Sequence, residues 1–407
     1  MKYLIVVPDG AGDEPISELG GKTPLEVAEM TCINRLASRG EVGMVKTIPD
    51  GMMPGSETAN MGLMGYDPAK YLTGRSPLEA MSMGIDMEAS DVAFRANIVT
   101  LSGEGSYENL TMTDHSSGEI TSEEAALLIE SLNEELSNDD TRFYPGVSYR
   151  HCMIVKNGTT DTEMTPPHDI LERRIGDFLP SGKGSIKLKE MMRKSYEILK
   201  NHPVNIKRIK EGKHPGNSLW FWGGGKRPSL DPFFDKYGLT GTAVSAVDLI
   251  KGIALFAGLD SVDVEGATGT LDTNYEGKKD AAINEFKRGK DFVYVHLEGP
   301  DECGHQADIE GKIEALQRID KRIVKPIVDF LIDSGDKFNV MVVPDHRTPI
   351  CIRTHSDPPV PFVIYRSYEE KPEDATKKFN EKSATQGKYF SEGYSLTDYF
   401  LQKDIIG

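Results

Sequence analysis

The sequence predicts an α/β fold with a mainly parallel sheet and helices on both of its faces. Three short apolar runs carry this prediction, at residues 3–7 (YLIVV), 291–297 (DFVYVHL) and 338–343 (FNVMVV). Each run is followed within four residues by a proline and an aspartate. Strands buried on both faces have such continuous hydrophobicity, and open α/β sheets bind ligands where parallel strands end. Residues 309–330 carry apolar side chains at helical spacing, as a helix packed on such a sheet would.

The middle of the chain has a different pattern and predicts a second domain. Residues 97–110, 150–156 and 218–222 are expected to form strands, and residues 122–135 an acidic amphipathic helix capped by Thr121 or Ser122. We therefore expect an α+β domain at residues 89–231, inserted into a core domain formed by residues 1–88 and 232–407. A length of 407 residues fits two or three domains of roughly 150 residues each.

The composition restricts the possible partners. The 47 basic and 64 acidic side chains give a formal net charge of −17, which disfavours nucleic acid and anionic membranes. No apolar run approaches the roughly 18 residues of a membrane span. Cys32, Cys152, Cys303 and Cys351 lie far apart without a CxxC pair, which favours reduced thiols and a cytoplasmic protein. A small phosphorylated substrate remains compatible with the acidic balance, because it needs only a local basic pocket.

Aspartates and histidines gather after the predicted strands. Asp301 and His305 are four residues apart, so both would face the same way on a helix. Carboxylate and imidazole donors together suit Mn, Zn or Fe. One such pair alone is more often an ordinary surface pair, and the spacing leaves a metal site and unrelated turn residues equally open. The candidate ligands are Asp9, Asp301, His305, Asp345, His346 and His355.

Ser56 follows Pro54-Gly55 and precedes helix-compatible residues. From the residues alone, a helix N-cap is the favoured role for such a serine. The alternative is a nucleophile at a helix N-terminus, where free N–H groups favour a phosphate. The segment is not a hydrolase nucleophile elbow, because that motif needs glycine at position 54.

The glycine-rich segments do not predict a nucleotide fold. Gly20-Gly21-Lys22-Thr23 lacks the earlier glycine of a P-loop and follows no strand, and residues 223–226 (GGGK) lack the GxGxxG spacing. In the middle domain, His115, Arg150, Lys226 and Arg227 could form a local basic pocket. Solvated surface charge is the favoured role for most basic residues there, and Arg150, beside an apolar strand, is the better candidate.

Taken together, these segments resemble the cofactor-independent phosphoglycerate mutases of the archaeal type, within the alkaline phosphatase superfamily. The resemblance spans the whole chain, and its joint set of motifs is far more specific than any single one. The motifs lie at residues 4–10, 54–60, 74–80, 94–97, 272–278, 300–305, 344–346 and 354–355.

The resemblance implies an alkaline-phosphatase-like core with two divalent metals, usually Mn²⁺ with Mg²⁺, Zn²⁺ or Co²⁺ as alternatives, and an inserted substrate domain. It makes Ser56 the nucleophile, against the capping role, and His115 the general acid/base. It gives His115, Arg150, Lys226 and Arg227 substrate-binding roles and leaves Arg75 and Lys278 without one. The implied ligands are Asp301, His305 and His355 for one ion, and Asp9, Ser56, Asp345 and His346 for the other.

The implied reaction interconverts 3- and 2-phosphoglycerate through a phosphoserine, without a bisphosphoglycerate cofactor. Two other activities stay open at this point. One is phosphate transfer to another small hydroxy acid, as in homoserine kinases proposed among bacterial relatives. The other is a plain phosphatase or a metal-binding regulator. The oligomeric state does not follow from the sequence.

Overall fold

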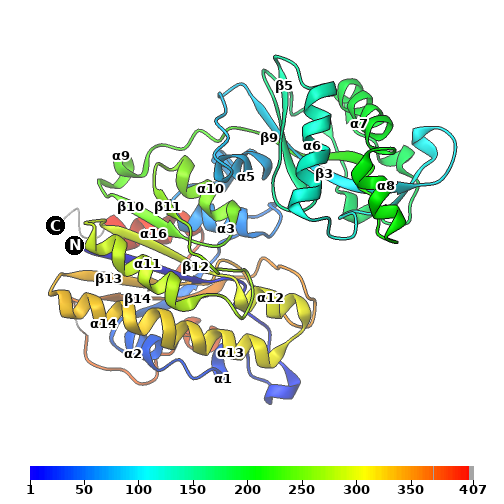
Figure 1. Ribbon diagram of the computed structural model, residues 1–407. Coiled ribbons are helices and arrows are strands. Elements are labelled where there is room, and N and C mark those ends of the chain that lie inside the picture. The colour runs from blue at the N-terminus through cyan, green and yellow to red at the C-terminus, as the bar shows by residue number, and fades with distance from the viewer. Residues whose placement is uncertain (370, 403–407) are drawn as a thin grey trace. The chain divides into compact units, whose positions relative to one another are not determined.

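The computed structural model describes residues 1–369 and 371–402 and divides into two compact units. The first consists of residues 1–72 and 230–407, and the second of residues 73–229. Figure 1 shows the elements of both units along the chain. None of the helices in the described ranges combines the length and hydrophobicity that a membrane span requires.

An eight-stranded sheet forms the centre of the first unit, in the order β11-β10-β12-β1-β13-β14-β2-β15. Its only antiparallel pairings among the described strands are those of β14 with β13 and β2, so the sheet is mainly parallel, as predicted. The strands are β1 (Lys2–Pro8), β2 (Glu41–Val45), β10 (Gly241–Val244), β11 (Asp260–Val262), β12 (Phe292–Leu297), β13 (Phe338–Val342), β14 (Val360–Arg366) and β15 (Lys388–Phe390).

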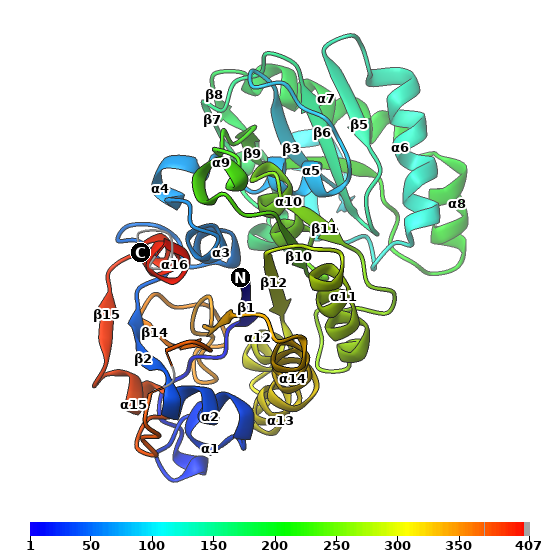
Figure 2. The ribbon, with the colours of Figure 1, turned by 90° about the vertical axis from the view of Figure 1, so that its left-hand side faces the viewer.

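Helices cover both faces of this sheet, which confirms the predicted fold class. In Figure 1, α11, α13 and α14 lie on one face, and α3, α10 and α16 on the other. Figure 2 shows the first group and the sheet edge at β15 from the side. The helices are α1 (Pro24–Val27), α2 (Thr31–Arg39), α3 (Ser56–Leu63), α4 (Pro68–Tyr71), α9 (Phe233–Tyr237), α10 (Asp248–Phe256), α11 (Tyr275–Lys287), α12 (Gly299–Gln306), α13 (Ile309–Ile319), α14 (Lys325–Ser334), α15 (Glu381–Ala384) and α16 (Gly393–Gln402), with a short 3₁₀ turn η1 (Ser17–Leu19).

The helix predicted over residues 309–330 is continuous but irregular. A π-helical turn, η5 (Asp320–Val324), joins α13 to α14. Pro326 at the start of α14 has no N–H to donate, and its ring would clash with the carbonyl four residues earlier. The wider π turn accommodates this proline without ending the helix.

The three predicted core strands are buried as expected and end at one edge of the sheet. Every residue from Leu4 to Pro8 is buried, as are all residues of β12 and β13. The parallel register pairs Pro8 with Leu297 and Val6 with Val342. The segments that carry the three aspartates therefore leave the sheet side by side.

The second unit is an α+β unit built on an antiparallel sheet, in which β3 pairs with β4, β6 and β9. Its strands are β3 (Val92–Ser102), β4 (Thr111–Asp114), β5 (Thr141–Tyr144), β6 (Arg150–Val155) and β9 (Ser218–Lys226), with a small pair β7 (Thr162–Glu163) and β8 (Ser181–Gly182). Its helices are α5 (Ser76–Ser82), α6 (Ser122–Leu136), α7 (Ser185–Leu199) and α8 (Pro203–Lys210), with 3₁₀ turns η2 (Tyr107–Asn109), η3 (Pro167–Ile170) and η4 (Ile175–Phe178).

Two features of this unit differ from the sequence-based expectation. The strand expected at residues 97–110 runs instead from Val92 to Ser102, because Gly103 and Gly105 adopt positive φ angles and turn the chain. The unit also begins at residue 73, whereas the expected domain was 89–231. The hydroxyl of Ser76 on α5 donates to the Gly223 carbonyl at 2.5 Å and accepts from the Arg95 N–H at 2.9 Å, which ties α5 to β9 and β3.

Candidate metal and phosphoryl-transfer site

Asp345 occupies the centre of the edge where β1, β12 and β13 end. Its Oδ1 accepts hydrogen bonds from the N–H groups of Gly10 at 3.0 Å and His346 at 2.9 Å. Its Oδ2 accepts one from Asn60 Nδ2 at 2.7 Å. Burial opposes ionisation of this carboxyl, but the neighbouring imidazoles of His346 and His296 outweigh it and hold the pKa of Asp345 below its usual range.

One cluster of donors forms around Asp301 on α12. His305 Nε2 lies 3.2 Å from Asp301 Oδ2, and His355 Nε2 lies 3.4 Å from Asp301 Oδ1. The two imidazole Nε2 atoms are 3.1 Å apart. The contact with Asp301 raises the pKa of His305 to about 9. The three ligands that the resemblance implied for one ion thus lie together, and His346 also offers a donor atom to this cluster.

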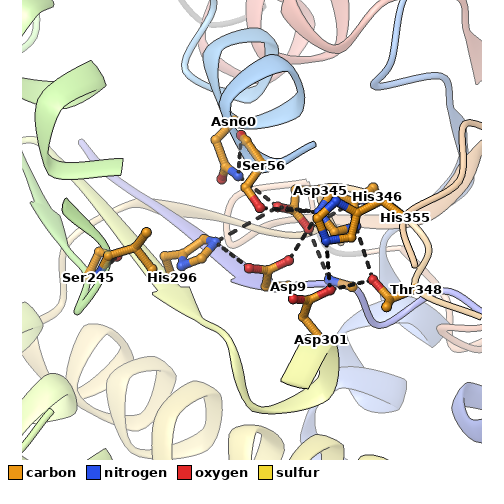
Figure 3. Close-up of polar contacts among 12 residues, drawn as sticks. Asp9, Ser56, Asn60, Ser245, His296, Asp301, Asp345, His346, Thr348 and His355 are labelled. Atoms are coloured by element: carbon orange, nitrogen blue, oxygen red, sulfur yellow. Dashed lines mark hydrogen bonds and ion pairs between the residues drawn. The ribbon is translucent and has the colours of Figure 1, made fainter. Parts of the chain in front are cut away.

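A second cluster contains Asp9, Asp345 and His346, whose donor atoms lie within 4.8 Å of one another. His346 Nε2 is 3.4 Å from Asp9 Oδ1, 3.5 Å from Asp345 Oδ2 and 3.2 Å from Ser56 Oγ. Figure 3 shows these side chains converging from β1, α3 and the segment after β13. The structure therefore brings together the four residues implied for the other ion.

The donor set fits divalent cations. Asp9 Oδ1 is buried without a hydrogen-bond partner. Burial, followed by the carboxylates of Asp345 and Asp301, raises the pKa of Asp9 well above its usual range. Three carboxylates packed this closely repel one another, and positive charge between them would relieve the repulsion. Carboxylate, imidazole and hydroxyl donors are those that Mn²⁺ and similar ions accept.

Ser56 is the first residue of α3, and the residue in the capping position is Gly55. No side chain caps this helix, so the capping role that the residues alone favoured is wrong. The Ser56 hydroxyl instead faces His346 Nε2. Asn60, one turn along α3, donates both to the Ser56 carbonyl at 2.9 Å and to Asp345, which links the helix start to the carboxylate cluster.

Gly10 permits the close approach of the two clusters. Its φ is +61°, and a Cβ atom there would lie 2.5 Å from Thr348 Oγ1 and 2.6 Å from Asp301 Oδ1. Any other residue would push the Asp301 carboxylate away. The Thr348 hydroxyl donates to Asp301 Oδ1 and helps to orient it.

Three residues of this site escaped the sequence reasoning: Asn60, His296 and Thr348. Asn60 follows Ser56 by four residues, so the shared helix face was a usable signal. His296 lies inside an apolar run, where a buried histidine carries no local signal of function. Thr348 lies two residues after His346, and only the folded geometry brings its hydroxyl to Asp301.

In the second unit, His115 and Arg150 both neighbour the ring of Tyr149. The ring centroids of His115 and Tyr149 are 5.7 Å apart, and the Arg150 guanidinium lies 5.1 Å from the Tyr149 ring centroid. His115 also neighbours His168 at 6.1 Å, and His168 neighbours Trp222 at 5.4 Å. His115 thus belongs to a chain of ring contacts that runs from Tyr149 through His168 to Trp222.

The other two basic candidates of the second unit are exposed and lie elsewhere on it. Lys226 lines a surface hollow of about 660 Å³ together with Lys156, Lys183 and Lys187. Arg227 donates to the Met87 carbonyl at 3.1 Å. Neither His115 nor Arg150 lines this hollow.

Comparison with known proteins agrees with the geometry. The family model for 2,3-bisphosphoglycerate-independent phosphoglycerate mutase matches residues 37–205. A Methanosarcina barkeri protein of that name is 48% identical over 388 residues, which cover 95% of this chain and 96% of the relative. A Geobacter sulfurreducens protein named as a probable member is 44% identical over 404 residues, covering 99% and 100%.

Two solved structures share the fold over nearly the whole chain. A Pyrococcus horikoshii protein has a TM-score of 0.81 at 28% identity, covering 98% of this chain and 96% of its own. A cofactor-independent phosphoglycerate mutase from Thermoplasma acidophilum has a TM-score of 0.68 at 27% identity, covering 99% and 100%. The resemblance seen in the sequence is confirmed, and the chain belongs to the 2,3-bisphosphoglycerate-independent phosphoglycerate mutase family.

Proposed function

We propose that this protein interconverts 3- and 2-phosphoglycerate without a bisphosphoglycerate cofactor, by moving the phosphoryl group through Ser56. The observation that carries the proposal is the position of the Ser56 hydroxyl, at the start of α3 and 3.2 Å from His346, a donor shared by both carboxylate–imidazole clusters. Family membership supports the same activity.

In this proposal, Asp301, His305 and His355 hold one divalent ion, and Asp9, Ser56, Asp345 and His346 hold the other. Manganese is the proposed metal, with Mg²⁺, Zn²⁺ and Co²⁺ as alternatives. When bound, the ions supply the positive charge that lowers the pKa of a coordinated hydroxyl and balances the charge of phosphoryl oxygens.

Ser56 Oγ, having lost its proton to solvent, attacks the phosphorus of the substrate in line and forms a phosphoserine. The bond from phosphorus to the substrate oxygen breaks, and glycerate stays bound with that oxygen protonated as an alcohol. The free N–H groups at the start of α3 can hydrogen-bond phosphoryl oxygens at this position. Glycerate then turns, and its other hydroxyl takes the phosphoryl group back.

We assign His115 the proton transfers: it protonates the departing glycerate oxygen and deprotonates the accepting hydroxyl. Arg150 is the first candidate for binding the substrate carboxylate or phosphate, because a guanidinium matches both anions with paired hydrogen bonds. Lys226 and Arg227 are weaker candidates than Arg150 for binding the substrate. The second unit would exclude water during transfer, because hydrolysis of the phosphoserine would make the enzyme a phosphatase.

The proposed partner is thus a small phosphorylated hydroxy acid in the cytoplasm. The described cysteines are all free thiols, which agrees with a reducing compartment.

The test is a coupled assay in which Mn²⁺ and 3-phosphoglycerate are added to the purified protein without nucleotide, and enolase reports 2-phosphoglycerate. We expect turnover that chelation of Mn²⁺ abolishes and that Ser56→Ala lowers by at least about four orders of magnitude. Ser122→Ala is a matched control, because Ser122 is also the first residue of a helix but lies outside both clusters. Absence of turnover together with nucleotide-dependent phosphorylation of homoserine would refute the proposal.

A further inference from the structure

His296 is the second-to-last residue of the apolar strand β12, and its side chain is 0% exposed. Neither of its ring nitrogens has a hydrogen-bond partner among the described residues. A buried imidazole without partners is costly, because each nitrogen has lost its hydrogen bonds to water. Such a group either carries an unrelieved penalty or faces a ligand that completes its bonding.

The ring points toward the second cluster. Its Nε2 lies 3.3 Å from Asp9 Oδ2 and 3.9 Å from Asp345 Oδ2, and Figure 3 shows the ring directed at both carboxylates. These separations exceed the usual 2.7–3.2 Å of an N–H···O hydrogen bond. Two donors that bind one ion at about 2.1 Å each lie about 3.0 Å apart when adjacent, and farther apart at wider angles. The observed distances therefore suit donors that share an ion.

Asp9 is arranged in a matching way. Its Oδ1 is 3.4 Å from His346 Nε2, and its Oδ2 is 3.3 Å from His296 Nε2. The two imidazoles thus flank one carboxylate, each on its own oxygen. The backbone holds His296 firmly in this position, because its carbonyl accepts a hydrogen bond from the buried Lys278 Nζ at 3.1 Å.

We propose that His296 Nε2 is a further ligand of the ion held by Asp9, Ser56, Asp345 and His346. This rests on the metal sites of the proposed function. The set would then contain two imidazoles, two carboxylates and one hydroxyl. Imidazole is a poor donor for Mg²⁺ and a good one for transition metals, so His296 shifts the selectivity of this site away from Mg²⁺.

The experiment measures metal binding to the metal-free protein by calorimetry, without substrate. The parent protein is expected to bind two Mn²⁺ ions. His296→Ala should weaken one of these sites by at least about tenfold and leave the other unchanged. Its Mg²⁺ affinity should fall by a smaller factor, so that the preference for Mn²⁺ over Mg²⁺ narrows.

His151→Ala is the matched control. His151 is also buried with an unpartnered Nε2, but it lies on β6 in the second unit and in neither cluster. This variant should bind both Mn²⁺ ions with the parent affinity. Equal weakening in His151→Ala and His296→Ala would show a general effect of losing a buried ring and would overturn the proposal. Parent-like Mn²⁺ binding by His296→Ala would overturn it as well.

Pulsed electron paramagnetic resonance of the Mn²⁺-loaded protein provides a second readout. One ¹⁴N coupling of the parent should vanish in His296→Ala, and retention of every coupling would contradict ligation. Where His296→Ala fails to fold, His296→Asn and His296→Gln replace it with the same expected losses. Metal binding is measured without turnover. If the parent protein is inactive but His296→Ala still weakens Mn²⁺ binding, only the proposed reaction is refuted. An active parent whose metal binding ignores His296 refutes only this inference.

Discussion

The proposed metal-binding edge of the first unit is built from the ends of buried strands, whereas the candidate residues of the second unit are half-buried or exposed and lie on loops and strand ends. Asp9 and Asp345 are buried, and backbone N–H groups orient Asp345. His115 is half-buried and is surrounded by rings, while Arg150 is exposed. Buried, hydrogen-bonded donors suit ions that need fixed donor positions, and more exposed side chains suit a substrate that turns during the proposed reaction.

His305 in the first unit and His168 in the second have pKa shifts of opposite sign, and the causes of these shifts differ. The Asp301 carboxylate raises the pKa of His305 to about 9, so this ring is protonated at pH 7. In the second unit, burial is the largest effect on His168 and lowers its pKa below the usual value. The Asp301 carboxylate thus favours the charged form of His305, whereas burial favours the neutral form of His168.

Replacement of His115 should have the largest effect, and it should lower catalysis without changing metal binding. His115→Ala is expected to lower kcat by about 10²–10⁴-fold, the usual contribution of a general acid/base. Calorimetric Mn²⁺ binding should be unchanged, since both clusters lie in the first unit. If the variant keeps the parent kcat, His115 has no role in the proton transfers. If Mn²⁺ binding is impaired, metal binding is not a property of the first unit alone.

Gly10→Ala should damage the metal-binding edge selectively. A Cβ at Gly10 overlaps Thr348 Oγ1 and Asp301 Oδ1, whereas a Cβ at Gly20, with a similar φ of +68°, meets nothing within 4 Å. Gly20→Ala therefore reports the cost of the positive φ alone, about 1 kcal/mol. We expect Gly10→Ala to cost about 2–4 kcal/mol of unfolding free energy and to weaken Mn²⁺ binding. If chemical denaturation gives the same loss of unfolding free energy for both variants, the strand edge accommodates a Cβ atom at Gly10.

The smallest expected effect is the pH dependence of Mn²⁺ binding. His305 is protonated at pH 7 in the metal-free protein because its raised pKa is about 9, and it must lose this proton to become a ligand. The apparent Mn²⁺ affinity of one site should therefore rise about tenfold per pH unit from pH 7 and level off near pH 9. Calorimetry at several pH values measures this slope. His305→Asn should flatten it, and an unchanged slope in that variant would assign the proton elsewhere.

The sequence predicted the parts of the molecule whose signals are local. The three apolar runs became β1, β12 and β13, and parallel pairing then brought Asp9, Asp301 and Asp345 to one edge. The i, i+4 spacing of Asp301 and His305 correctly indicated one face of a helix. The strand at 218–222 continues through its glycines to Lys226.

Other parts depended on long-range packing and left no local signal. The polar and charged stretch after residue 370 supplies β15 at the sheet edge, and Leu396 and Phe400 of α16 are buried. Ser56 resembles an N-cap from its residues alone, and only the approach of His346 from the segment after β13 places its hydroxyl in the cluster. His296 is indistinguishable from a core residue until its carboxylate neighbours are known.

The central claim is that the strand edge of the first unit transfers a phosphoryl group through Ser56. The most direct measurement is to quench the enzyme during turnover of 3-phosphoglycerate with Mn²⁺ and to map covalent phosphate by mass spectrometry. The account predicts one phosphate on the peptide that contains Ser56, absent when Mn²⁺ is chelated. Turnover with no phosphate on the protein, or with phosphate on another residue, would contradict it.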